Sequence, residues 1–88
     1  STIGLNMPDK LSNIQKIERV ESIARQCYWT ERDCEIGMVS GSDREVVVTV
    51  CGSIDSTAIK ILAQCPEFDR ISPHYDGDNN VVTFRFPS

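Results

Sequence analysis

The chain has 88 residues, of which 13 are acidic and 9 basic, and its net charge is −4. This length predicts a single domain over residues 1–88, and a composition of 40% apolar and 25% charged residues is that of an ordinary folded protein. It excludes collagen-like and disordered chains, and no apolar run approaches the roughly 18 residues of a membrane span. The first residues, STIGLNMPDK, lack the apolar stretch of a signal peptide, so we expect a cytoplasmic protein with no membrane partner.

The first predicted element is a helix over residues 9–28, which follows an N-terminal arm of residues 1–8. Pro8 suits the first helical turn, and the carboxylate of Asp9 favours the positive end of the helix dipole. Apolar side chains recur at helical spacing and predict one buried stripe: Ile17, Val20, Ala24 and Cys27.

Two strands are predicted next, over residues 34–40 and 45–51. The second, EVVVTVC, has four valines and a threonine, which are β-branched residues that favour a pleated sheet. The short segment between the strands has the glycine and polar residues typical of a turn, so the two strands are expected to form a hairpin.

A second helix is predicted to begin after Ser53 or Asp55, either of which suits a helix cap, and to end near Gln64. Pro66 stops it because proline cannot continue a helix. Its apolar residues also form one stripe: Ile54, Ala58, Ile61, Leu62 and Cys65.

The chain ends with two further predicted strands, over residues 70–75 and 81–86. Between them, residues 76–80 have the sequence DGDNN, which is typical of a hairpin turn. Pro73 has no N–H to donate to a neighbouring strand, so the strand 70–75 belongs at the edge of a sheet.

The element order is therefore αββαββ, which predicts an α+β two-layer sandwich. Four mainly antiparallel strands would carry two helices on one face, in a circularly permuted ferredoxin-like arrangement. That arrangement orders the strands third, fourth, second, first, and places the two most apolar strands at the centre. The halves 9–52 and 53–88 repeat this order of elements, which indicates either an internal αββ repeat or a chance likeness of two valine-rich strands.

Alternation along the central strands predicts which side chains face the helices. The more apolar set is expected to form the core: Val46, Val48, Val50, Val82, Phe84 and Phe86. The opposite set is expected to lie on a sheet face that two helices cannot cover, and to bind a partner: Val47, Thr49, Val81, Thr83 and Arg85.

The four cysteines, at positions 27, 34, 51 and 65, lack the close paired spacing of a structural zinc site, so no metal site is predicted. Cys27 and Cys65 are expected to be core residues. Cys34 and Cys51 lie at the far ends of the predicted hairpin, where a redox pair or a metal-binding pair is an alternative. In a reducing compartment such a pair would stay reduced.

No catalytic constellation, cofactor motif or small-molecule substrate site is evident, and no sequence signature pairs His74, the only histidine, with a cysteine. The sequence therefore favours a non-enzymatic regulatory domain that binds another protein or itself as a homodimer. It would act through the exposed sheet face or an edge strand, as small viral or plasmid-encoded inhibitors do. Nucleic acid is a less favoured partner because the chain is acidic, although one side of the helix 9–28 is basic.

Overall fold

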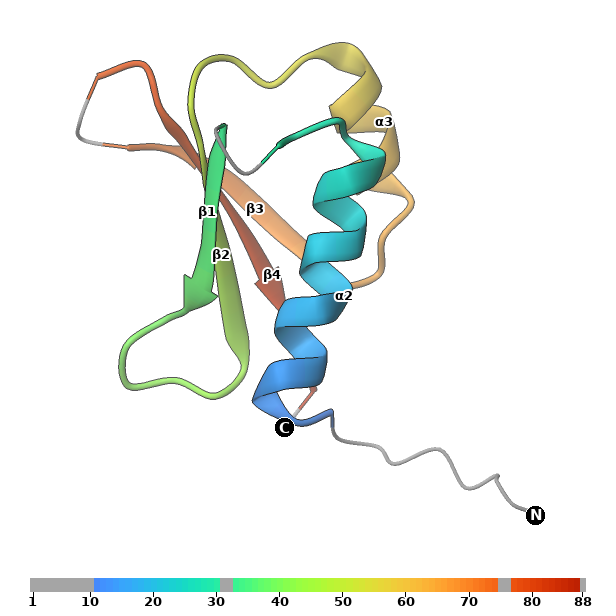
Figure 1. The fold of residues 1–88 in the computed structure, drawn as a ribbon, viewed down its shortest axis with the longest axis vertical. Coiled ribbons are helices and arrows are strands. Elements are labelled where there is room, and N and C mark those ends of the chain that lie inside the picture. The colour runs from blue at the N-terminus through green and yellow to red at the C-terminus, as the bar shows by residue number, and fades with distance from the viewer. Residues whose placement is uncertain (1–10, 31–32, 75–76, 88) are drawn as a thin grey trace.

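The structure is a computed structural model that describes residues 11–30, 33–74 and 77–87 (Figure 1). The predicted arm 1–8, and Tyr75 and Asp76 of the last hairpin, lie outside the described residues. The element order αββαββ is confirmed: α2 (Asn13–Gln26), β1 (Cys34–Met38), β2 (Glu45–Val50), α3 (Ser56–Ala63), β3 (Phe68–Pro73) and β4 (Asn80–Arg85).

Helix α2 begins later than the sequence analysis predicted. The hydroxyl of Ser12 accepts a hydrogen bond from the backbone N–H of Gln15 at 3.2 Å, and the Gln15 side chain accepts one from the Ser12 N–H at 2.9 Å. This reciprocal capping box satisfies two N–H groups that a helix start leaves unpaired. The helix therefore starts at Asn13, later than the predicted residue 9, which itself lies outside the described residues.

Helix α3 is capped by Asp55, one of the two predicted cap residues, whose carboxylate accepts a hydrogen bond from the Ala58 N–H at 2.8 Å. The helix has only eight residues. An isolated helix of this length is unstable in water, so α3 depends on tertiary packing. Within the helix, Ala58 and Leu62 are the buried residues that provide it.

The four strands form one antiparallel sheet in the order β1-β2-β4-β3. The predicted strand order is confirmed, with Pro73 on an edge strand and the two valine-rich strands at the centre. Val48 of β2 lies opposite Ile36 of β1 and Val82 of β4, so these three side chains share one face of the sheet.

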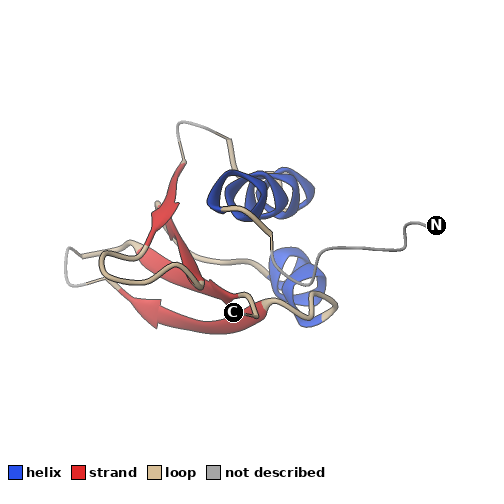
Figure 2. Cartoon of the chain, turned by 90° about the horizontal axis from the view of Figure 1, so that it is seen from below, coloured by secondary structure: helices blue, strands red, loops and turns tan. Residues whose placement is uncertain are grey.

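Both helices lie on the same side of the sheet, which gives a two-layer molecule (Figure 2). The core between the layers consists of Val20, Ile23, Cys27, Val46, Val48, Val50, Ala58, Leu62, Val82, Phe84 and Phe86. The six strand residues predicted to face the helices are all in this core. None of the helices among the described residues is long and apolar enough to cross a membrane.

Candidate functional site

The residues predicted to bind a partner lie together on the side of the sheet away from the helices. Val47 is opposite Thr83, and Thr49 is opposite Val81, across the central strands. Thr83 is only 2% exposed, because Val47 and Arg70 flank it on the two neighbouring strands. Thr83 therefore offers little contact area, whereas Arg85 is exposed and the remaining three are half-buried.

Cys34 and Cys51 occupy the first hairpin but point to opposite faces of the sheet. Cys34 pairs with Val50, a core residue, and is half-buried on the helix side. Cys51 follows Val50 by one position, which reverses its direction in a strand, and it is exposed. All four cysteines are free thiols, and a disulfide between these two would require the hairpin to rearrange.

Three of the thiols lie in surroundings that disfavour the thiolate. Burial raises the pKa of Cys27 to about 11, and it also raises the pKa of Cys34 and of Cys65. Reactive cysteines have a lowered pKa, so these three have the character of structural thiols. Among the described residues, no cluster of three or more histidine, cysteine and acidic side chains is suited to hold a metal ion.

Alkylation of the native protein is expected to modify the exposed Cys51 first and the buried Cys27 last. The raised pKa of Cys27 favours the folded state below its ordinary value of 9.0, and that stabilisation is lost as the pH rises through about 11. The alkaline loss of stability should therefore be smaller in Cys27→Ala than in the wild type. Peptide mapping of iodoacetamide-treated protein and urea titrations over this pH range measure both effects. Equal alkylation rates for the two thiols at pH 8 would contradict the structure.

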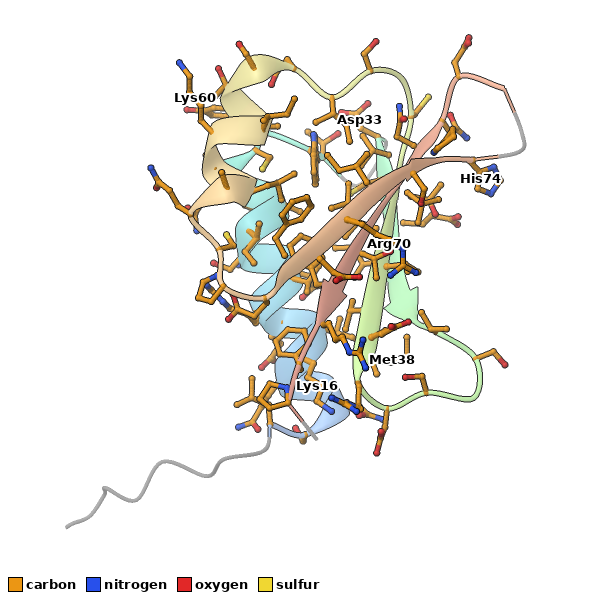
Figure 3. The ribbon with its side chains drawn as sticks, turned by 180° about the vertical axis from the view of Figure 1, so that it is seen from behind. Lys16, Asp33, Met38, Lys60, Arg70 and His74 are labelled. Atoms are coloured by element: carbon orange, nitrogen blue, oxygen red, sulfur yellow. The ribbon has the colours of Figure 1, made fainter. Side chains whose placement is uncertain are left out.

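Two bases of the first helix are held by contacts within the fold. The Lys16 side chain, labelled at the lower end of α2 in Figure 3, donates to the backbone carbonyl of Asp43, and Lys16 is 5% exposed. Arg19 donates two hydrogen bonds to the carboxylate of Glu67, at 3.1 and 3.2 Å. Burial acts to raise the pKa of Glu67, but the Arg19 hydrogen bond and charge outweigh it, so this pKa lies below its ordinary value. These contacts engage Lys16 and Arg19 within the fold, whereas Arg25 of the same helix is exposed.

A groove of ≈ 710 Å³ lies between α2 and the edge strand β1, and we call it the α2–β1 groove. Its walls are mostly apolar, with one acid and one base from α2 among them. It is lined by Glu21, Ala24, Arg25, Tyr28, Trp29, Thr30, Cys34 and Ile36. None of the sequence patterns described above predicts this groove.

Tyr28 contributes to this groove in an unusual backbone conformation. The helix ends in a Schellman motif, in which the Trp29 N–H donates to the Ala24 carbonyl and the Tyr28 N–H to the Arg25 carbonyl, both at 3.0 Å. This motif places Tyr28 at φ 62°, a left-handed conformation that glycine usually occupies. Tyr28 is also 80% exposed, so packing does not compensate the strain. Strain of this kind, held at an exposed aromatic residue beside a groove, is a feature of binding sites.

The sequence does contain a signal for this feature. No glycine or asparagine follows Gln26 and the C-cap Cys27, where a helix commonly ends in one, and two aromatic residues stand there instead. The groove itself carries no such signal, because it forms between a helix and a strand that meet only in the folded chain.

The two edges of the sheet differ in how open they are. Strand β3 contains Pro73, a register shift between Phe68 and Arg70, and a charged pair, all of which discourage pairing with another strand. Strand β1 has five residues with no proline, no register shift and the single charge of Glu35. The open edge of the sheet is therefore β1, and it borders the α2–β1 groove.

Comparison of the chain with protein-family models, with curated proteins and with solved structures finds no match. The open edge of β1, the α2–β1 groove and the strained Tyr28 are therefore the observations from which a function is inferred.

Proposed function

We propose that this chain is a non-enzymatic protein-binding domain that holds an extended segment of polypeptide along β1. The observation that carries the proposal is that Cys34 and Ile36 belong both to the open edge and to the α2–β1 groove. In binding by strand addition, backbone hydrogen bonds provide affinity and side-chain pockets provide specificity. An edge strand with an adjoining groove supplies both.

The chemistry of the groove favours an apolar or aromatic side chain of the bound segment. Ala24, Trp29 and Ile36 offer apolar contacts, and the exposed ring of Tyr28 adds an aromatic surface at low entropic cost. A regulatory or inhibitory role in the cytoplasm, and kinship with a permuted ferredoxin-like fold, are parts of the same proposal. The two-layer architecture and the antiparallel strand order β1-β2-β4-β3 support the kinship with this fold.

The alternatives are less well supported by the geometry. A redox or metal site at Cys34 and Cys51 would need side chains that share one face of the hairpin. A nucleic-acid site on α2 would need Lys16 and Arg19 to leave the carbonyl and carboxylate that they contact. Docking on the far sheet face is a second candidate, because Val47, Thr49, Val81 and Arg85 lie there and neither α2 nor α3 covers them.

Tyr28→Gly is expected to stabilise the fold and weaken binding at the same time. Relief of the left-handed strain raises the free energy of unfolding by about 1–2 kcal/mol. The greater freedom of glycine in the unfolded chain lowers it by about 0.4–1 kcal/mol. The net gain in the free energy of unfolding should be about 0.5–1 kcal/mol, measured by urea denaturation. Extended peptides selected from a displayed library on the wild-type protein should bind the variant about tenfold more weakly.

Tyr28→Phe is the matched control, because it keeps the ring and the strain and should bind these peptides as the wild type does. A Tyr28→Gly protein that binds every selected peptide with wild-type affinity would rule out the α2–β1 groove as the site. The far sheet face would then be the better candidate.

A further inference from the structure

We propose that the segment added along β1 is the β1 strand of a second copy of this chain. The inference rests on the proposed function and names its partner. Two sheets of four strands would then join into one of eight, with a two-fold axis passing between the two Ile36 residues.

The backbone N–H and C=O groups of β1 point alternately toward β2 and away from it. The Val39 N–H donates to the Glu45 carbonyl at 3.1 Å, and the Cys51 N–H donates to the Asp33 carbonyl at 2.7 Å. The odd-numbered residues of this segment are therefore hydrogen-bonded to β2. Because bonding direction alternates along an antiparallel strand, Ile36 and Met38 direct their N–H and C=O groups away from the sheet. In the described part of the chain no strand pairs with that side.

One register pairs the whole strand and leaves only the Met38 carbonyls without a donor. If Ile36 of one copy lies opposite Ile36 of the other, Met38 lies opposite Cys34, and all five residues of β1 are paired. The Ile36 pair exchanges two N–H to C=O hydrogen bonds, and each Met38 N–H reaches a Cys34 carbonyl. The Cys34 N–H, which would be the donor to the Met38 carbonyl, instead donates to the Thr30 carbonyl at 3.1 Å.

The same register avoids a clash of charge on the far face of the sheet. Glu35 of one copy lies opposite Gly37 of the other, which has no side chain. A register shifted by two residues toward the start of β1 would instead set Glu35 directly opposite Glu35, and like charges in that position are destabilising. The single charge on β1 is therefore compatible with a second β1 in the register that pairs the whole strand.

The flank of α2 beside β1 is also self-complementary. Glu21 and Arg25 line the groove next to Ile36, and a two-fold axis at Ile36 sets the two helices in opposite directions. Glu21 of one copy then faces Arg25 of the other. Ile14 and Tyr28 lie on the same helical stripe and are 70% and 80% exposed. Five paired residues alone fall short of the roughly 1,200 Å² of a stable interface, and these side chains supply further area.

Gly37 provides a test that leaves the single chain intact. A Cβ atom built at Gly37 meets nothing within 4 Å, and its backbone is outside the left-handed region, so side chains are tolerated there. In the proposed dimer, Gly37→Glu sets two carboxylates against the two Glu35 residues, whereas Gly37→Lys sets two ammonium groups against them. Sedimentation equilibrium should show self-association of the wild type, about tenfold weaker in Gly37→Glu and as tight or tighter in Gly37→Lys.

The charge-swapped double variant, Glu35→Lys with Gly37→Glu, should restore association, and the differences should shrink at high salt. A wild type that stays monomeric overturns the inference, as does a Gly37→Lys variant weakened as much as Gly37→Glu. Circular dichroism and urea denaturation confirm that each variant is folded. If the protein is monomeric but still binds the selected peptides in a Tyr28-dependent way, only the proposal that the partner is a second copy is wrong. If it neither self-associates nor binds the peptides in this way, the proposed function is wrong too.

Discussion

Replacing Phe84 by alanine is expected to lower the free energy of unfolding by about 3–5 kcal/mol. Phe84 lies on the central strand β4, is 0% exposed and stands opposite Val46. Its ring also meets that of Phe68 edge to face, with centroids 6.3 Å apart and an angle of 68° between the rings. The variant loses both the buried ring and this contact, and leaves a cavity in a core that has only two layers.

Urea denaturation followed by circular dichroism measures the loss at Phe84. Small domains have total stabilities of about 5–15 kcal/mol, so Phe84→Ala is expected to be largely unfolded in mild denaturant. Phe84→Leu keeps most of the apolar volume and should cost less than about 1.5 kcal/mol. Ile71→Ala, at a residue 37% exposed on the neighbouring strand, is a second control with a smaller expected cost. A Phe84→Ala protein as stable as the Ile71 variant would show that this ring is not central to the core.

Leu62→Ala is expected to cost about 2–5 kcal/mol and to release α3 from the sheet. Leu62 is 1% exposed, and with Ala58 it supplies the buried residues of an eight-residue helix that is too short to persist alone. Loss of this anchor should therefore affect the helix more than the strands.

Ile59→Ala is the matched control, because Ile59 lies on the same helix and is 50% exposed. It should change stability by less than about 1 kcal/mol. Amide hydrogen exchange should show that the α3 amides lose protection in Leu62→Ala before those of β2 and β4 do. Unchanged exchange in α3 would mean that the helix is held by other contacts.

The regular elements were readable from local patterns because their side chains repeat at the period of the backbone. The valines at 46, 48 and 50 alternate as a half-buried strand requires, and Pro73 is excluded from a central strand by its missing N–H. Pro8 and Asp9 resemble a helix start, but α2 starts at Asn13, behind the capping box that Ser12 and Gln15 form. The S-x-x-Q pattern of this capping box is the local signal that marks the start of α2.

Most of the candidate site could not be predicted from the sequence, for a different reason. Trp29 and Ile36 are seven residues apart in sequence and line one groove only because the chain turns back beside α2. Thr83 was expected to be available to a partner, but Val47 and Arg70 on the adjacent strands leave it 2% exposed. Cys34 and Cys51 were predicted to be an alternative redox or metal-binding pair. Cys34 lies opposite Val50, one residue before Cys51, so the two cysteine side chains point to opposite faces of the sheet.

The sequence by itself determined the order of elements, the order of strands and the face of the sheet that forms the core. Each follows from periodicity, proline and the burial of apolar side chains, which are properties of neighbouring residues. Only the tertiary structure decided that β1 is the open edge beside a groove, that Lys16 and Arg19 are held within the fold, and that Tyr28 is strained and exposed. These depend on distances between segments that are separate in the chain, and such distances are set when the helices pack on the sheet.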